Sequence, residues 1–321
     1  MGNSDKVLTA TAPHVEPGTA VGAAKFSASL GLNVPAGSKL KFSSLADAPF
    51  GVEVTGVDWS RPDAEMARLI HIALRRHLLL VLRSKASPTE EQLDEFFRGL
   101  GRLVLDTEDG KAHYAEHLGK GPASKEKLAM KDFLQRSADN KGSTLYNPGA
   151  EGISELAWHN DQYHKPMLKV VSVFEALDVE AGVIPTEFRD MYTAYEMLPA
   201  DLRSELEHKN IIYFDPRLPG PQDMPRLCDS MHPVFQPHPH SGRKSLLVND
   251  FSDRIAGLNR ADSDALLQRL REHADASAPK YVHQWTSGDM AVWDNIGLQH
   301  RRDAVPGRQK RNMRQYGGLA E

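Results

Sequence analysis

The chain has 321 residues, a formal net charge of −4 and 40% hydrophobic residues, which predicts a sizeable core and no basic surface for nucleic acid or anionic lipid. Its one cysteine, Cys228, excludes an internal disulfide and is typical of a reducing compartment. No stretch reaches the roughly 20 apolar residues that span a bilayer, and no apolar signal segment begins the chain, so we expect a cytoplasmic protein.

The N-terminal half of the chain gives one weak and several strong signals. Residues 1–40 are rich in Gly, Ala, Pro, Ser and Thr without sustained periodicity, and we expect a poorly ordered tail. Residues 50–59 alternate like a strand, residues 64–77 place apolar side chains at helical spacing, and residues 78–83 are typical of a buried strand. Start signals and closing glycines predict another helix over residues 87–101.

Residues 104–157 are polar and rich in Gly and Lys, and we expect them to form an active-site lid or loop region. Beyond them the pattern predicts strands over residues 168–179, 210–215, 241–250, 281–295 (two strands around a turn) and 310–318, and helices over residues 189–198, 199–209 and 262–276. Since helices do not regularly separate the strands, the order favours a mainly β fold with flanking helices (α+β), a sandwich or jelly roll, over a Rossmann or TIM arrangement. We expect a single domain over residues 41–321.

The stretch WHNDQYH, residues 158–164, contains candidate metal ligands. His159 and Asp161 are two apart, so in an extended segment their side chains project to the same side. The third candidate is His300, at the end of GDMAVWDNIGLQH. Two histidines and one carboxylate on one face of an octahedral metal leave three positions open, as in non-haem Fe(II) oxygenases. The alternative is a satisfied polar pair in a turn.

Two further residues could bind the distal carboxylate of a chelating co-substrate. Arg311 follows His300 in a strand-like segment, and guanidinium binds carboxylate through two parallel hydrogen bonds. Thr186 follows the strand predicted over residues 168–179 and could add a hydroxyl to the same carboxylate.

Several motifs, in order, resemble the taurine dioxygenase and aryloxyalkanoate dioxygenase family of Fe(II)/2-oxoglutarate-dependent oxygenases. They are FGVEVTGVDWSRP, HLLLVLR, WHNDQY, GVIPT, DMYTAYEMLP, GDMAVWDNIGLQH and RQKRNMRQY, covering roughly residues 45–318. The resemblance implies a double-stranded β-helix (jelly-roll) core, with His159, Asp161 and His300 as catalytic iron ligands and with Arg311 and Thr186 binding 2-oxoglutarate. It also implies that Fe(II), 2-oxoglutarate and O2 hydroxylate an unactivated C–H bond of a small organic substrate, with C–S, C–O or C–N cleavage in some cases, and yield succinate and CO2.

The chain departs from this family where the substrate would bind. The family's Gly-Gly-Asp-Thr reads Val-Ile-Pro-Thr here, and the second, anion-binding arginine four residues after the first is Gln315, with Arg314 one residue earlier. Because one step along a strand reverses the side chain, either Arg314 points away from the pocket or a bulge re-aims it. Asp106 falls where some members place a substrate-contacting histidine. Gln162, directly after Asp161, is a further candidate for the pocket.

Other readings stay open. His113 and His117 are four apart and could form a zinc pair, and His232, His238 and His240 could form a small metal tract, although loop histidines are the simpler interpretation of both. A non-catalytic jelly-roll binding or scaffold protein is the alternative function, but it would be expected to lose a ligand or the co-substrate arginine. We expect a small-molecule substrate and a homo-oligomer, and no nucleic-acid or membrane partner.

Overall fold

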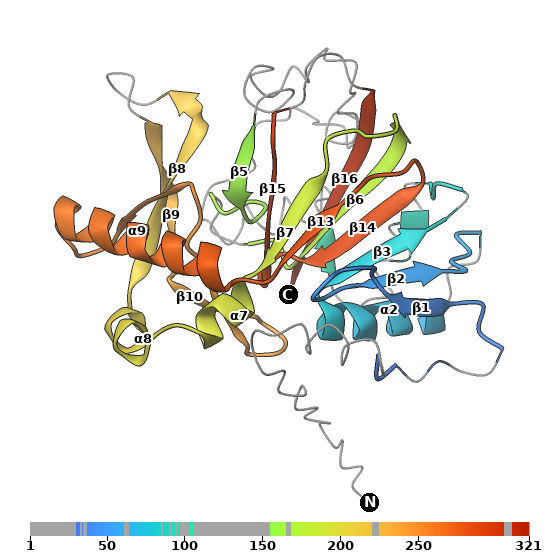
Figure 1. Ribbon diagram of the computed structural model, residues 1–321, viewed down its shortest axis with the longest axis horizontal. Coiled ribbons are helices and arrows are strands. Elements are labelled where there is room, and N and C mark those ends of the chain that lie inside the picture. Colours follow the sequence, from blue (N-terminus) through green and yellow to red (C-terminus); the bar gives the residue numbers. More distant parts are fainter. Residues whose placement is uncertain are drawn as a thin grey trace, which may run out of the picture.

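The computed structural model places two β-sheets face to face, with helices and a smaller strand layer outside them (Figure 1). It describes residues 30–32, 34, 37–60, 64–84, 86–89, 92–93, 96, 103–105, 155–164, 168–219, 225–304 and 310–320. Within these ranges no helix is both long and apolar enough to cross a membrane.

The larger sheet has seven strands in the order β1-β2-β3-β14-β6-β16-β4. They are β1 (Lys41–Ser44), β2 (Val52–Thr55), β3 (Leu79–Arg83), β14 (Asp289–Asp294), β6 (Val171–Val179), β16 (Arg311–Ala320) and β4 (Leu103–Leu105). Neighbours are antiparallel except β2 and β3, which are parallel and connected through α2 (Ala64–His77).

The smaller sheet has four antiparallel strands in the order β13-β7-β15-β5. They are β13 (Lys280–His283), β7 (Thr186–Asp190), β15 (Leu298–Arg302) and β5 (Leu156–His159). Two facing antiparallel sheets around one core form a jelly roll.

Strand β3 explains how the larger sheet is buried on both faces. Leu79 and Val81 point into the core between the sheets, where they join Phe188 of the smaller sheet. Leu80 and Leu82 point the other way and pack in the cluster that includes helix α2. A strand covered on both faces reads as a continuous apolar run, which accounts for the sequence of residues 78–83.

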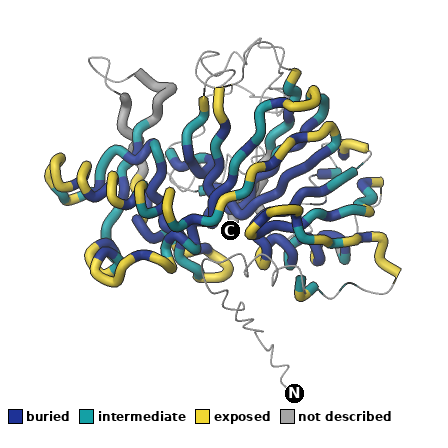
Figure 2. Tube along the Cα trace, in the orientation of Figure 1, coloured by how far each residue is buried: buried dark blue, intermediate teal, exposed yellow. Residues whose placement is uncertain are grey.

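A third layer covers the outer side of the smaller sheet, at the left of Figure 1. It contains β8 (Asn210–Pro219), β9 (Pro225–Pro233), β12 (Ser252–Ile255), the pair β10 (Phe235–Pro237) and β11 (Lys244–Leu246), and helices α7 (Met191–Glu196), α8 (Ala200–Leu206) and α9 (Arg260–Ser277). Helix α9 buries one side against this layer and exposes the other (Figure 2).

The structure confirms the predicted mainly β architecture and the helix over residues 64–77. The helix predicted over residues 189–198 begins only at Met191, because Arg189 and Asp190 end strand β7. The Asp190 carboxylate caps this helix by accepting the N–H groups of Tyr192 and Thr193 at 2.9 and 3.2 Å. The two strands predicted around the Ser-Gly-Asp turn exist as β13 and β14, but they join different sheets and do not form a hairpin.

Three predicted segments lie wholly or mostly outside the described residues. These are the tail over residues 1–40, the helix over residues 87–101 and the lid over residues 104–157, of which only the two ends are described, in β4 and β5. The domain boundaries therefore stay a prediction.

Candidate metal centre

The pairing of β5 with β15 brings two histidines together. His159 ends β5 and lies directly opposite His300 of β15, with ring centroids 4.1 Å apart. Asp161 follows in the turn after β5, where its Oδ1 is 3.9 Å from Nε2 of His159 and 3.7 Å from Nε2 of His300. All three residues are buried, and in the described part of the chain they are the only such group that could hold a metal ion. The structure therefore brings these three side chains together, as the sequence predicted.

The ionisation states at the centre suit a divalent metal. His159 Nδ1 donates to the Ala157 carbonyl at 2.8 Å, which fixes the proton on Nδ1 and leaves the lone pair on Nε2. Burial, followed by the proximity of His159, lowers the pKa of His300 to about 3, so this ring is neutral at pH 7. Burial alone would raise the pKa of Asp161, but His300, Lys169, His159 and the Ser172 hydroxyl outweigh it and bring that pKa to about 2. Neutral imidazoles and an ionised carboxylate are the forms that bind metal.

His300 also provides a direct test of whether an ion fits here. Its Nε2 is fully buried and has no hydrogen-bond partner among the described residues. Buried polar atoms are rarely left without partners, so such an atom facing a carboxylate and a second imidazole is well explained by a bound cation. The residues present therefore fit a divalent metal with histidine and carboxylate ligands.

Side-chain amides hold the segment that contains two of the candidate ligands. Asn295 accepts the N–H of Asp161 at 2.8 Å and donates to the carbonyls of Asp161 and Lys169 at 3.1 and 2.9 Å. Asn160, between His159 and Asp161, points the opposite way and donates to the Asn295 carbonyl at 2.7 Å. The turn at residues 160–161 is thus tied to the turn that precedes β15. The position of the carboxylate is set by the protein itself.

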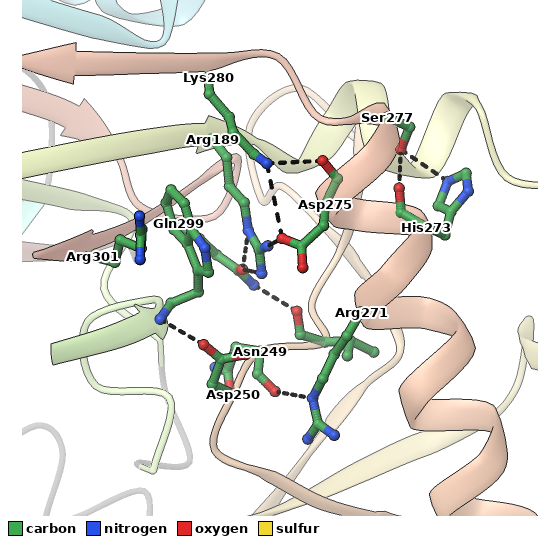
Figure 3. Close-up of polar contacts among 12 residues, drawn as sticks. Arg189, Asn249, Asp250, Arg271, His273, Asp275, Ser277, Lys280, Gln299 and Arg301 are labelled. Atoms are coloured by element: carbon green, nitrogen blue, oxygen red, sulfur yellow. Dashed lines mark hydrogen bonds and ion pairs between the residues drawn. The ribbon is translucent and has the colours of Figure 1, made fainter. Parts of the chain in front are cut away.

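A second network extends from Asn160 to the outer side of the smaller sheet. Figure 3 shows its outer part, in which Gln299, Arg189 and Asp275 lie together. Gln299 donates to the Asn160 side chain at 3.2 Å and accepts from Nε and Nη2 of Arg189 at 3.0 and 2.6 Å. Arg189 is almost wholly buried, lies 4.5 Å from the Trp158 ring centroid and donates to Asp275 at 2.7 Å. Burial lowers the pKa of Arg189 to about 10, so it remains charged. The guanidinium thereby supports the residue between the two ligands.

The predicted 2-oxoglutarate residues face the core between the sheets. Met313 of β16 packs in the inter-sheet core, and Arg311 of the same strand lies close enough to Arg302 of the smaller sheet to be repelled by it. Nε of Arg311 is buried without a hydrogen-bond partner among the described residues, and burial, followed by repulsion from Arg302, lowers its pKa to about 9. Thr186 is buried, and its hydroxyl oxygen accepts from Trp285 Nε1 at 2.9 Å. A buried cation and an oriented hydroxyl are suited to a carboxylate.

The two candidate substrate-binding residues on β16, Gln315 and Arg314, point to opposite faces of the strand. Gln315 Nε2 donates to Oδ2 of Asp161 at 2.9 Å, so this side chain faces the metal centre. Arg314 points to the other face of the strand, where it pairs with the buried carboxylate of Glu175 and donates to the Pro88 carbonyl at 2.8 Å. The structure therefore selects the first of the two predicted alternatives, in which Arg314 points away from the pocket.

The remaining candidates are placed as follows. Gln162 directly follows Asp161 in the left-handed conformation, with φ of 59°. His238 is buried and accepts the N–H groups of His240 and Ser241, each at 3.2 Å, so it stabilises a turn and is not part of a metal tract. Asp106, His113 and His117 lie outside the described residues.

Sequence reasoning missed several residues around the centre. Ser172, Asn295, Gln299 and Arg189 received no role, although each is polar and each lies in or beside a strongly apolar strand. A polar residue at a position that strand alternation assigns to the interior was the available signal.

A jelly roll with two opposed histidines and a carboxylate at one end of its interior defines the class of non-haem metal-dependent oxygenases. The model of the "Taurine catabolism dioxygenase TauD, TfdA family" matches residues 41–316, and the chain belongs to this family. Pentalenolactone F synthase of Streptomyces avermitilis is 26% identical over 301 residues, covering 86% of this chain and 92% of that protein. The (S)-phenoxypropionate/alpha-ketoglutarate-dioxygenase of Delftia acidovorans is 26% identical over 276 residues, covering 80% and 87%.

Solved structures agree on the fold. The crystal structure of a putative alpha-ketoglutarate-dependent taurine dioxygenase from Burkholderia xenovorans superposes with a TM-score of 0.64 at 22% identity, covering 88% of this chain and 93% of that chain. AAD-2 in complex with Mn(II) and N-oxalylglycine gives the same TM-score and identity, covering 88% and 98%. The protein is an Fe(II)/2-oxoglutarate-dependent dioxygenase of this family, and it uses Fe(II), 2-oxoglutarate and O2 on a small-molecule substrate.

Proposed function

We propose that this dioxygenase hydroxylates an unactivated C–H bond of a small organic substrate, coupled to the formation of succinate and CO2. Where the hydroxylated carbon bears sulfur, oxygen or nitrogen, the product would then lose that group. The observation that carries the proposal is the opposition of His159 and His300 across β5 and β15, with one oxygen of Asp161 facing both Nε2 atoms.

In this proposal the three side chains bind the metal through Nε2 of His159, Nε2 of His300 and Oδ1 of Asp161. When bound, iron and 2-oxoglutarate supply the activation of O2 that C–H oxidation needs. The neutral His300 imidazole and the ionised Asp161 carboxylate require no proton release near pH 7, since their pKa values are about 3 and about 2. The aromatic rings of Trp293 and Phe174, with centroids 4.9 and 5.8 Å from that of His300, pack against this ring, which is buried.

Arg311 and Thr186 are the proposed anchor for the distal carboxylate of 2-oxoglutarate. Arg311 keeps its charge at neutral pH although its Nε is buried, and an incoming carboxylate would satisfy that charge. The Thr186 oxygen already accepts from Trp285, which leaves the hydroxyl hydrogen to donate to the same carboxylate.

The substrate itself is proposed only as a class. Two relatives are named for a phenoxypropionate and for pentalenolactone F, and two more are named as an alkylsulfatase and a sulfate ester dioxygenase. The compounds in these names are small organic molecules or their esters. Gln162 beside Asp161 and Asp106 beyond β4 stay the predicted pocket residues. A cytoplasmic location, supported by the single cysteine, and a homo-oligomeric state also stay predictions.

Stimulated succinate formation tests this proposal. Purified protein with Fe(II), ascorbate, 2-oxoglutarate and O2 would be offered sulfonates, sulfate esters, aryloxy acids, amino-acid derivatives and neutral small molecules. At least one class should raise succinate well above the uncoupled background and yield a hydroxylated or cleaved product by mass spectrometry. His300→Ala, the matched control, should abolish both signals. Succinate without substrate oxidation in every class would contradict the proposed reaction.

A further inference from the structure

One oxygen of Asp161 is held by two donors that come from the opposite sheet. Ser172 Oγ donates to Oδ2 at 2.5 Å, and Gln315 Nε2 donates to the same oxygen at 2.9 Å. Ser172 lies on β6 and Gln315 on the neighbouring β16, both in the larger sheet, whereas Asp161 follows β5 of the smaller sheet. These two hydrogen bonds therefore connect the sheets at the metal centre.

The strand register explains why Gln315 is the residue that reaches Asp161. Gln315 is paired with Phe174, and Arg314 is paired with Glu175, whose buried carboxylate holds the arginine on the outer face. The irregularity in this pairing falls between Asn312 and Met313, before Arg314 and Gln315, so alternation continues undisturbed from Met313 to Gln315.

The two hydrogen bonds make the surroundings of the two carboxylate oxygens different. Oδ2 accepts from Ser172 and Gln315, while Oδ1 is the oxygen within 3.9 Å of both histidine Nε2 atoms. A carboxylate whose second oxygen is engaged by two donors is restrained from rotating or from binding an ion through both oxygens. A bidentate carboxylate would occupy one of the positions that the co-substrate and O2 need.

We propose that Ser172 and Gln315 are positioning residues that fix Asp161 as a ligand through Oδ1 alone, and that Gln315 serves the metal centre and does not recognise a substrate anion. This inference rests on the proposed ligand role of Asp161. It also predicts that β16 supplies no cation to the substrate, because Arg314 pairs with Glu175 and Arg311 is the proposed anchor for 2-oxoglutarate.

The test measures metal binding without turnover. Mn(II) affinity would be determined from the EPR signal of free Mn(II) for wild type, Ser172→Ala, Gln315→Leu and the double variant. Each single substitution should weaken Mn(II) binding by about tenfold or more, the range seen when groups that orient metal ligands are removed. The visible spectrum of the Co(II)-substituted protein should change in band position or intensity. Asn312→Ala on the same strand is the matched control and should behave as wild type.

Each outcome decides the matter. If Ser172→Ala and Gln315→Leu, both shown to be folded by circular dichroism, bind Mn(II) as wild type does, the positioning role is overturned. It is equally overturned if Gln315→Leu changes only the KM of a substrate. Should Gln315→Leu fail to fold, Ser172→Ala alone carries the measurement. A folded wild type that binds no Mn(II) would overturn the metal centre itself. His159→Ala sets the level of non-specific Mn(II) binding against which the wild type is compared.

Discussion

Replacing Arg189 by methionine removes the charged end of the network that supports Asn160 and keeps an unbranched apolar side chain at this position. Arg189 is almost wholly buried, and its guanidinium makes two hydrogen bonds to Gln299, one ion pair to Asp275 and a contact with the face of Trp158. Methionine replaces the aliphatic part of the arginine side chain but satisfies none of these polar groups.

The size of the destabilisation follows from the polar groups that lose their partner when Arg189 is replaced. The buried Gln299 oxygen loses both donors, which costs about 1–3 kcal/mol, and the lost cation–π contact with Trp158 costs about 1–2 kcal/mol. The ion pair to Asp275 adds little, because the Asp275 side chain is 57% exposed. Relief of the desolvated charge offsets part of this cost, as the lowered pKa of Arg189 implies. We expect a net destabilisation of about 2–4 kcal/mol.

Urea unfolding followed by circular dichroism measures this change as a shift in midpoint at constant slope. Asp275→Asn is the matched control, since it removes only the exposed partner and should cost less than about 1 kcal/mol. A loss below about 0.5 kcal/mol for Arg189→Met, or equal losses for both variants, would refute the reasoning that the buried Arg189–Gln299 pair stabilises the sheet behind the metal centre.

Three further predictions concern the centre directly. Arg311→Gln should weaken 2-oxoglutarate binding to the Mn(II) protein about a hundredfold, because loss of a buried charge partner costs about 3 kcal/mol of binding free energy. If calorimetry gives the same affinity as for the wild type, the anchor lies elsewhere. The free energy of unfolding of the metal-free protein should fall as the pH drops from about 6.5 towards 3, by up to about 1.4 kcal/mol per pH unit. The reason is that His300, with its pKa lowered to about 3, stays neutral in the folded state while the same residue of the unfolded chain binds a proton. His300→Asn should lose that part of the slope between pH 7.5 and 5.5, and equal slopes in urea unfolding would contradict the buried neutral ring. Removing the metal with a chelator should lower Tm by about 5 °C. Mn(II) at a hundred times its Kd should restore Tm, because binding to the folded state then contributes about 2.7 kcal/mol of stability. A Tm that neither treatment changes would argue against a metal site in the folded state.

The two-residue spacing of His159 and Asp161 predicted that their side chains project to the same side of an extended segment. The structure places Asp161 in the turn after β5, where Asn295 holds its backbone and its Oδ1 lies 3.9 Å from Nε2 of His159. The partner His300 was also identified from the sequence, but its position directly opposite His159 depends on the pairing of β5 with β15. Such pairing joins segments far apart in the chain, and a single sequence carries no register between them.

The choice between Arg314 and Gln315 shows the same limit. Alternation predicted that only one of them could face the centre, and the answer came from Glu175, which pairs with Arg314 on the neighbouring strand. Arg189 was expected in a helix and instead ends β7, where its register partner across the sheet is Gln299. Strand alternation signals such a buried polar residue only where the segment is recognised as a strand, and Arg189 was assigned to a helix, in which a polar side chain predicts a surface position.

The most direct test of the iron centre is the anaerobic addition of Fe(II) and 2-oxoglutarate to the purified protein, followed by its visible absorption spectrum. If His159, Asp161 and His300 bind Fe(II) with 2-oxoglutarate chelated beside them, a weak metal-to-ligand charge-transfer band should appear in wild type and vanish in His159→Ala. A wild-type protein that gives no band, and no succinate once air is admitted, would contradict the account.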